Sequence, residues 1–286
     1  MKLHKPINNN IVSAFDDDNQ EIIVIGRGIG YKAKEGAIID KESVQKVFRM
    51  SSQRETDHLK ALFASIPDAH LELTDKIFSY ARETLQKRLN ERAFISLADH
   101  LNFAVQRYNQ GMSFQNVLLP EVRHFYPQEF AVGKHALVLI KERLGIDFPD
   151  DEAASIALHI FNAEYDVSIS SVFHATKLMD TIAGIAESEF GCIIRENDYF
   201  SERFLLHIKL LALRVVNKEY LPRQDNKFIE FMELASARYP EELGCAKKIA
   251  DYIMREHDYE LLQEEVFNLT MHMKRIRINV TEVANA

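Results

Sequence analysis

The 286-residue chain has only two cysteines, Cys192 and Cys245, and their separation fits no metal or redox motif. A disulfide-stabilised scaffold or a cysteine metal site is therefore not expected, and both thiols are predicted to be reduced core residues. No apolar run approaches the roughly 18 residues of a membrane-spanning helix, and Met1–Asn10 has no apolar signal core. These absences predict a cytoplasmic protein that is not inserted in a membrane.

The chain also lacks an excess of positive charge. Its net charge is −8; residues 1–50 hold eight Lys and Arg against seven Asp and Glu, and the remainder holds 27 against 36. An acidic body excludes non-specific binding of nucleic acid by the chain as a whole. The segment 26–34, whose charged residues are all basic, could still contact a nucleic acid locally.

Two short runs rich in apolar and β-branched residues, Ile11–Phe15 and Glu21–Ile25, flank a segment rich in Asp and Asn. This pattern predicts a β-hairpin with its turn at Asp16–Gln20. Further strands are expected at Ala37–Ile39 and Val47–Met50. A sheet of this size buries little surface by itself, so we expect it to pair with a second copy in a homodimer.

Three glycines stand close together in Gly26-Arg27-Gly28-Ile29-Gly30. Neither an apolar-periodic helix nor a βαβ unit accompanies them, which argues against a dinucleotide-binding loop. Two interpretations remain open. The segment is either a simple glycine-rich turn between strands, or a turn through which the backbone, Arg27 and Tyr31 approach a nucleic acid closely.

Two stretches of 34 residues resemble each other within the chain. Tyr126–His159 and Tyr239–His272 both begin with Tyr-Pro, carry Glu three residues after the Tyr and end with His, at a constant offset of 113 residues. Seven positions are identical without a gap, including Glu152 and Glu265. This register indicates an internal repeat.

A second histidine precedes each of these stretches. His100 and His207 lie in similar helical contexts, 107 residues apart, and each is followed seven residues later by an arginine, Arg107 or Arg214. Seven residues are two helical turns, so the histidine and the arginine share a helix face. The glutamate of each 34-residue stretch likewise shares a face with the terminal histidine.

Helical periodicity dominates after residue 56. The pattern predicts a polar linker at Ser51–Thr56, a helix at Leu71–Leu89, and a joint between the repeats at Val167–Ser171. Another helix is expected to start after Pro149, where three acidic residues, Asp150–Glu152, favour the helix dipole.

Composition agrees with packed cores, since 47% of the residues are hydrophobic and 27% are charged. We therefore predict an α+β multidomain protein. A small antiparallel β-sheet domain (residues 1–56) is followed by two all-α helical-bundle domains (residues 57–170 and 171–286).

The four repeated histidines allow three interpretations. A histidine on an apolar helix face is most often a hydrogen-bonded core residue. The four could instead bind a metal in a helical enzyme, although no two of them have three- or four-residue spacing and no cysteine accompanies them. Alternatively, a neutral imidazole nitrogen accepts a phosphoryl group from a donor protein, and nearby arginines pair with the added charge.

Lys5-Pro6-Ile7-Asn8-Asn9-Asn10, followed by Gly26-Arg27-Gly28-Ile29-Gly30-Tyr31, resembles the co-antiterminator RNA-binding domain of the BglG/LicT family of transcriptional antiterminators. The two repeats resemble that family's two PTS regulation domains. The resemblance covers essentially the whole chain, in the family's domain order. It implies a dimeric four-stranded antiparallel sheet that binds a structured RNA hairpin and prevents a terminator from forming in a sugar-utilisation operon, such as one for β-glucosides. It implies neither an enzyme nor a cofactor.

The resemblance also implies which residues contact RNA: Lys5, Asn10, Gly26, Arg27 and Tyr31. The family usually has Phe at the last of these positions, and Tyr keeps the face on which a base can stack. It commonly has Val, Ile or Leu where this chain has Pro6. Asn10 offers both a donor and an acceptor, and Lys5 would position a phosphate.

In the family, the four histidines are phosphorylated; here they are His100, His159, His207 and His272. Phosphorylation of the first repeat by a sugar-specific Enzyme II is expected to inactivate the protein, and phosphorylation of the second by the phosphocarrier HPr to activate it. Asp99 is expected to orient His100, and Arg107 and Arg214 to pair with the phosphates. The added charge would shift the dimer between arrangements.

A third class, a DNA-binding activator with the same regulatory domains, would need a helix-turn-helix. The strand-rich N-terminal region does not predict one.

Overall fold

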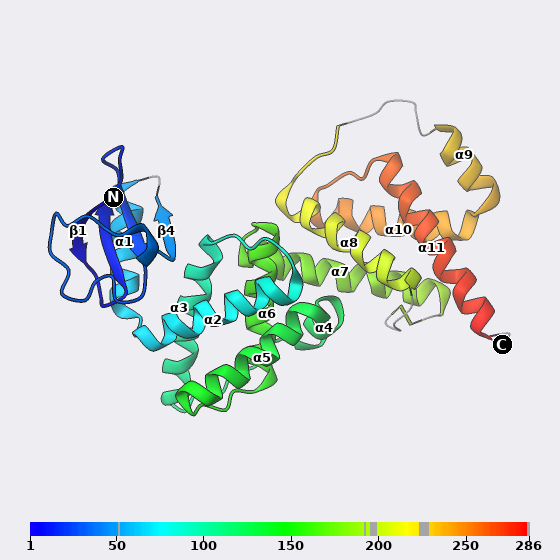
Figure 1. The fold of residues 1–286 in the computed structure, drawn as a ribbon. Coiled ribbons are helices and arrows are strands. Elements are labelled where there is room, and N and C mark those ends of the chain that lie inside the picture. The colour runs from blue at the N-terminus through cyan, green and yellow to red at the C-terminus, as the bar shows by residue number, and fades with distance from the viewer. Residues whose placement is uncertain (51, 192, 195–198, 223–228, 285–286) are drawn as a thin grey trace. The chain divides into compact units, whose positions relative to one another are not determined.

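The computed structural model describes residues 1–50, 52–191, 193–194, 199–222 and 229–284 (Figure 1), without the side chains of 199, 229 and 278–284. The chain forms two compact units. One comprises Met1–Val117 with Gln128–Asp166, and the other Leu118–Pro127 with Val167–Ala286. Of the two cysteines, Cys245 is buried as predicted, and Cys192 lies outside the described residues.

The first unit starts with four strands, β1 (Lys2–Pro6), β2 (Ile11–Phe15), β3 (Glu21–Ile25) and β4 (Lys46–Arg49). They form an antiparallel sheet in the order β1-β2-β3-β4. The predicted hairpin is confirmed, since Ile11 pairs with Ile25 and Phe15 with Glu21. Pro6 ends the edge strand β1, where its missing N–H removes no interior ladder bond. Of the two further runs, the second forms β4, and Ile38 makes only an isolated bridge to Lys2.

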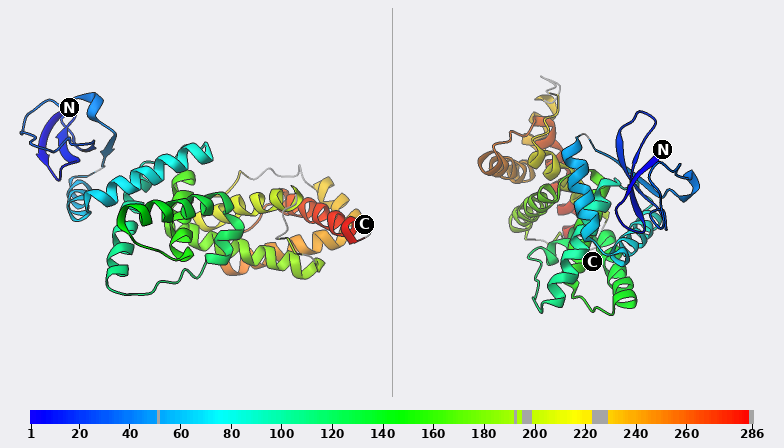
Figure 2. Two further views of the ribbon diagram at one scale, coloured as in Figure 1. Left: turned by 60° about the horizontal axis from the view of Figure 1, so that its bottom comes forward. Right: turned by 90° about the vertical axis from the view of Figure 1, so that its left-hand side faces the viewer.

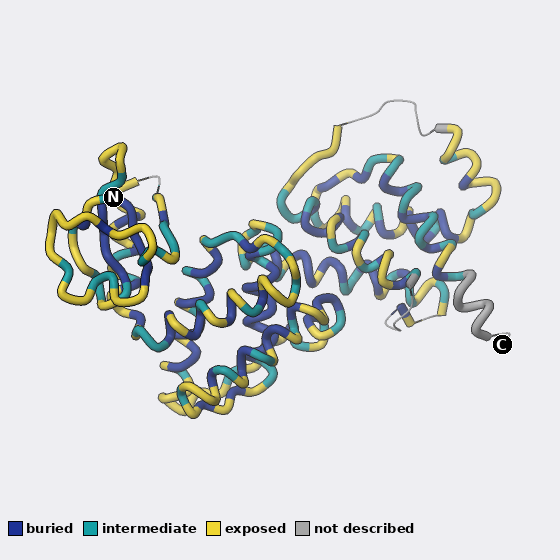
Figure 3. The backbone as a smooth tube through the Cα atoms, in the orientation of Figure 1, coloured by how far each residue is buried: buried dark blue, intermediate teal, exposed yellow. Residues whose placement is uncertain are grey.

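Both faces of the sheet are buried, which explains why β3 is a continuous apolar run rather than an alternating one. On one face Ile23 and Ile25 join a core with the helices that follow, and on the other Ile22 and Val24 join a smaller cluster. The Phe48 ring of β4 lies 6.0 Å from the Phe63 ring of the first helix. Packing against the helices therefore buries one face of the small sheet. The buried strands are dark in Figure 3.

The rest of the chain is helical, which confirms the predicted fold class. The helices of the first unit are α1 (Gln53–Ser65), α2 (Asp68–Leu85), α3 (Arg92–Asn109), α5 (Pro127–Leu144) and α6 (Asp150–Tyr165). Those of the second are α4 (Leu119–Phe125), α7 (Ile169–Phe190), α8 (Tyr199–Asn217), α9 (Ile229–Arg238), α10 (Pro240–His257) and α11 (Gln263–Ala284). In the first unit α3 packs against α2 and α6, and in the second α8 packs against α7 and α11 (Figure 2).

Two predicted boundaries are wrong for a local reason. The expected linker at Ser51–Thr56 is helical from Gln53 onward, because the Ser52 hydroxyl accepts a hydrogen bond from the Glu55 N–H and caps α1; Ser51 lies outside the described residues. Ser52-x-x-Glu55 is a capping-box sequence, so the signal was present. In the same way Ser168 caps α7, which occupies Ile169–Ser171 of the expected joint between the repeats.

The helix predicted at Leu71–Leu89 is confirmed as α2, which starts at Asp68 and ends at Leu85 because Gln86 adopts a left-handed φ of 52°. The helix expected after Pro149 is confirmed as α6. It is buried along most of its length, which Figure 3 shows.

The Tyr-Pro pairs of the repeat mark helix starts. Pro127 and Pro240 are the first residues of α5 and α10, where a missing N–H has no cost. Tyr126 is fully buried, and its hydroxyl lies 2.8 Å from that of Thr176 in α7. None of the described helices is both long enough and apolar enough to span a membrane.

Candidate functional sites

The glycine-rich loop after β3 is held against the turn before β2. Gly26 N–H donates to Asn10 O at 2.9 Å, and Gly30 N–H donates to Asn9 O at 3.0 Å. Within this frame the Asn10 side-chain oxygen accepts a hydrogen bond of 2.8 Å from Gly28 N–H. The two segments, 15 or more residues apart in sequence, therefore form one cross-braced turn.

Glycine is required here for two different reasons. Gly28 has φ +69°, a left-handed conformation that other residues rarely adopt. At Gly26 and Gly30, an added Cβ would lie 2.0 Å from the carbonyl oxygens of Ser43 and Asn8. Close backbone packing, rather than simple turn flexibility, thus fixes the loop.

Two side chains of the loop are exposed to solvent. Arg27 is exposed and has no hydrogen-bond or ion-pair partner among the described residues, and the Tyr31 ring is 64% exposed. Lys5 is exposed on β1, paired with Ser13 across the ladder, and its side chain makes no polar contact with the loop. The structure therefore brings Asn10, Gly26 and Arg27 together and leaves Lys5 on the edge strand.

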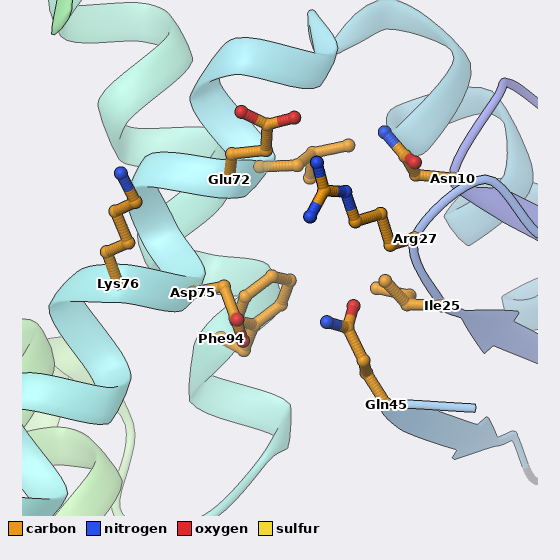
Figure 4. A pocket seen from close by; sticks show the side chains of 9 residues that line it. Asn10, Ile25, Arg27, Gln45, Glu72, Asp75, Lys76 and Phe94 are labelled. Carbon is orange, nitrogen blue, oxygen red and sulfur yellow. The ribbon is translucent and has the colours of Figure 1, made fainter. Parts of the chain in front are cut away.

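Arg27 and Asn10 also line a pocket of about 320 Å³ with residues of α2 and α3. Figure 4 shows the Arg27 side chain pointing toward α2, which carries Glu72 and Asp75 at this pocket. Nearby, Lys46 Nζ lies 2.8 Å from Asp75 Oδ1. In this arrangement the Arg27 side of the loop faces carboxylates of the same chain.

The first histidine pair lies between α3 and α6. The ring centroids of His100 and His159 are 4.8 Å apart. His159 is buried, with its Nδ1 3.1 Å from the Ser96 hydroxyl. His100 Nε2 lies 3.2 Å from Glu152 Oε2, without hydrogen-bond geometry, and Arg107 forms an ion pair with the other Glu152 oxygen. The expected common face of histidine and arginine is therefore present.

The second pair repeats this frame between α8 and α11. The rings of His207 and His272 are again 4.8 Å apart, and Arg214 donates to Glu265 Oε1 at 2.6 Å. The other Glu265 oxygen accepts a hydrogen bond of 2.9 Å from Leu262 N–H instead of facing a histidine. His207 Nε2 is buried with no hydrogen-bond partner among the described residues.

Three of these histidines are held neutral. Burial lowers the pKa of His207 and of His272 to about 4, and lowers the pKa of His159 well below its ordinary value. Nearby groups lower these pKa values further. His100 acts on His159, and Arg214 acts on His207. His207, Arg275 and Arg203 act on His272. A neutral imidazole has a free electron pair on one nitrogen, which a nucleophile requires.

One expected contact is wrong. Asp99 is exposed and forms no hydrogen bond or ion pair with His100; the carboxylate beside that ring is Glu152. The sequence placed Glu152 and Glu265 on the histidine faces, but the repeat alone gave no reason to pair them with Arg107 and Arg214.

The alternatives raised by the sequence find no support in the geometry. Within the part of the chain that the structure describes, no three His, Cys, Asp or Glu side chains gather to hold a metal ion. Residues 1–50 form strands, turns and one 3-10 helix (Lys41–Ser43), so they contain no helix-turn-helix.

The sheet and the repeats match two known domain types. The CAT RNA binding domain family matches residues 1–57, and the PRD domain family matches residues 75–163 and 180–276, which confirms the internal repeat. The protein is thus of the class of RNA-binding regulators built from one CAT domain and two PRD domains.

Individual relatives cover nearly the whole chain. Transcription antiterminator LicT of Bacillus subtilis is 36% identical over 276 residues, covering 96% of this chain and 99% of that protein. The Beta-glucoside operon antiterminator of Dickeya chrysanthemi is 34% identical, covering 99% of each. The crystal structure of GlcT CAT-PRDI is similar with a TM-score of 0.51 at 30% identity, over 57% of this chain and 98% of that one. The chain belongs to the BglG/LicT family of transcriptional antiterminators.

Proposed function

We propose that this antiterminator binds an RNA hairpin as a cytoplasmic homodimer and thereby prevents a terminator from forming in a sugar-utilisation operon, with a β-glucoside operon as the first candidate. Lys5, Asn10, Gly26, Arg27 and Tyr31 contact the RNA. One observation carries this proposal: the loop, braced by Asn10, leaves Arg27, the residue after Gly26, and Tyr31 exposed to solvent.

These groups suit the chemistry of RNA loops. Sequence-specific readers of RNA stack unpaired bases on aromatic rings or guanidinium planes and bond their edges. Tyr31 supplies a ring and Arg27 a guanidinium. Asn10 contributes less directly, since its oxygen already accepts the Gly28 N–H and only its remaining capacity is open to RNA. Lys5 positions a phosphate.

Titration of a labelled hairpin with internal loops by the full chain, at fixed salt, tests the RNA proposal. Tyr31→Ala is expected to weaken binding by about 1–3 kcal/mol, the usual loss of one stacked base. Arg27→Ala is expected to act in the same direction, whereas Lys41→Ala, an exposed cation outside the loop, leaves the affinity nearly unchanged. Equal affinities for all four proteins would remove the loop from the RNA interface.

We further propose that His100, His159, His207 and His272 accept phosphoryl groups, the first two from a sugar-specific Enzyme II and the last two from HPr. The electron pair of a neutral imidazole nitrogen forms the new N–P bond while the bond between the phosphorus and the donor protein's side chain breaks, and the donor atom keeps those electrons. The low pKa values of His207 and His272 support this role, because both rings stay neutral at pH 7.

The switch follows from added charge at a packed site. A phosphoryl group brings about 1.5–2 negative charges at pH 7. Arg107 and Arg214 are already paired with Glu152 and Glu265, so the new charge competes with a buried carboxylate for its arginine. Repacking of the helices that carry these residues then shifts the dimer arrangement and the spacing of the RNA-binding domains.

Replacing His207 and His272 together by Asp imitates part of that charge. The variant is expected to dimerise and bind the hairpin more tightly than the parent, as followed by sedimentation and the same titration. The matched control is His135→Asp. His135 stacks on Tyr80, with 3.7 Å between the ring centroids, and belongs to neither histidine pair. If the double variant behaves as the parent does, activation through the second repeat is refuted.

A further inference from the structure

The two histidine pairs share a frame but differ at their rims. In each pair the ring centroids lie 4.8 Å apart, and a buried glutamate pairs with the arginine two turns beyond the first histidine. Because the chain contains an internal repeat, each residue around one pair has an equivalent around the other, and the two sets can be compared position by position.

Two rim positions carry arginine in the second pair alone. Arg203 lies four residues before the first histidine of that pair on α8, and Arg275 lies three residues after the second histidine on α11. Each is therefore one helical turn from a paired ring, on the same face. At the repeat offsets of 107 and 113 residues, the first pair has Ser96 and Asn162.

Both arginines are exposed to solvent. Their charges act on the His272 ring. Burial lowers the pKa of His272 most and His207 next, and Arg275 and Arg203 lower it further. The acidic neighbour Glu202 is also exposed, but it lies five residues before His207 and off the face that Arg203 shares.

The two equivalent positions of the first pair, Ser96 and Asn162, are neutral instead. Ser96 bonds the His159 ring, and Asp99 lines a pocket of about 410 Å³ together with Ser96. Arg92 lines that pocket too, but it is eight residues, more than two turns, before His100. The nearest charge to His100 Nε2 in the ion pairs of this site is the Glu152 carboxylate.

We propose that Arg203 and Arg275 are positioning residues that hold the phosphoryl group received by the second histidine pair, and that the first pair lacks such a clamp. This inference rests on the proposed phosphorylation of the histidines. Arg203 and Arg275 would make phosphorylation of the second pair act in the opposite direction to phosphorylation of the first.

The physical reason is the pairing of a dianion. Arginine binds phosphate oxygens through two parallel N–H donors, and such charge-assisted bonds are about twice as strong as neutral ones. In the second repeat the new charge meets two arginines, and the repeat tightens. In the first repeat it meets Glu152 beside His100, and like-charge repulsion loosens the packing of α3 on α6.

The test uses the full chain and phosphoramidate, a small donor that needs no docking surface. The ring nitrogen forms its N–P bond as the reagent's N–P bond breaks, and ammonia leaves. Phosphohistidine content is measured by phosphorus NMR and its sites by tandem mass spectrometry. Amide hydrogen exchange with solvent is then measured in α8 and α11 of the second repeat and in α3 and α6 of the first. It is compared before and after reaction, at equal phosphohistidine content.

In the parent protein, phosphorylation is expected to slow exchange in α8 and α11 by about tenfold, the effect of one charge-assisted hydrogen bond. Arg203→Ser with Arg275→Asn is expected to abolish that protection, and Lys at both positions to restore part of it. Arg255→Ser, which removes an exposed arginine of α10, leaves it unchanged. The reciprocal change, Ser96→Arg with Asn162→Arg, is expected to turn loosening of the first repeat into protection.

Failure of the arginine clamp can be distinguished from failure of the proposed histidine phosphorylation. Equal protection in the parent and in the Arg203→Ser, Arg275→Asn protein, at equal phosphohistidine content, overturns the clamp and leaves the phosphorylation proposal standing. If none of the four histidines is modified by phosphoramidate or by phosphorylated HPr, both proposals are overturned. Exchange in the unmodified variants establishes that they fold as the parent does.

Discussion

Replacing Gly30 by Ala tests whether the loop is as tightly packed as the structure indicates. The added Cβ would lie 2.0 Å from the Asn8 carbonyl oxygen and 3.2 Å from its carbonyl carbon. Since the obstacle is backbone, no side chain can rotate away, and the turn at Asn8–Asn10 has to move. The hydrogen bond from Gly30 N–H to Asn9 O, which lies in that turn, is then strained or lost.

Overpacking of this kind typically costs about 1–3 kcal/mol, so the free energy of unfolding of the sheet should fall by that amount. The same movement disturbs the bond between Gly28 N–H and Asn10, which shapes the exposed loop. Affinity for the RNA hairpin should therefore fall as well, at temperatures where the variant is still folded. Denaturant unfolding followed by circular dichroism, together with the hairpin titration, measures both effects.

Gly184 provides the control. It lies within α7, and an added Cβ there would meet no atom within 4 Å. Gly184→Ala is expected to stabilise the protein by about 0.5–1 kcal/mol, because Ala loses less backbone entropy in a helix. If Gly30→Ala and Gly184→Ala change stability in the same direction, and RNA affinity is unaffected by both, the close-packing argument for the loop is refuted.

Three further predictions concern buried or facing carboxylates. Burial, and then the nearby Glu129, raises the pKa of Glu164 from 4.5 to about 7. The carboxyl therefore binds its proton more tightly in the folded protein than in the unfolded chain. The resulting stabilisation is complete below pH 4.5 and is lost as the pH rises through 7. Glu164→Gln is expected to remove that part of the fall in unfolding free energy between pH 5 and pH 8, measured by denaturant titration. Glu72→Gln, which neutralises a carboxylate facing Arg27, is expected to strengthen hairpin binding a few fold, whereas Glu83→Gln, exposed on the same helix outside the pocket, changes it less. Glu265→Ala leaves Arg214 partly buried without its carboxylate and is expected to lower the unfolding free energy by about 3–5 kcal/mol, more than the double change with Arg214→Met.

The elements that depend on local patterns could be predicted from the sequence. The hairpin follows from two apolar runs around Asp16–Gln20, and α6 follows from Pro149 and the acidic residues after it. The start of α1 at Gln53 is also encoded, in the Ser52-x-x-Glu55 capping box, but the polar composition of this segment is equally typical of a linker.

Contacts between distant residues could not be predicted in this way. A period of seven residues places His100 and Arg107 on one face, but it does not say which side chain the opposite helix supplies between them. Glu152 occupies that place only because α6 packs on α3 with one register. Likewise, the pairing of Asn10 with the glycine loop depends on the geometry of two turns that meet across the sheet.

The matched glutamates near the start of each 34-residue stretch have different charged partners in the two repeats. Glu129 is buried and lies in contact range of Lys87, which also pairs with Glu164 at 2.5 Å. At the position equivalent to Glu164, 113 residues later, the second repeat has Arg277, which pairs with the matching buried Glu242.

In the first repeat two carboxylates therefore share one lysine, whereas in the second Glu241 and Glu242 share Arg277, and Glu242 also lies 3.5 Å from Lys274 Nζ. Arg277, at the position equivalent to Glu164, adds positive charge to the second repeat, as do Arg203 and Arg275 at the positions equivalent to Ser96 and Asn162. Because a new anion interacts with the sum of nearby charges, the three positions that carry an arginine only in the second repeat (Arg203, Arg275 and Arg277) are expected to favour a phosphoryl group there more than in the first repeat. Since the helices that carry the histidines pack on each other in both repeats, α3 on α6 and α8 on α11, the charges around the pairs are the difference that the reciprocal substitutions test.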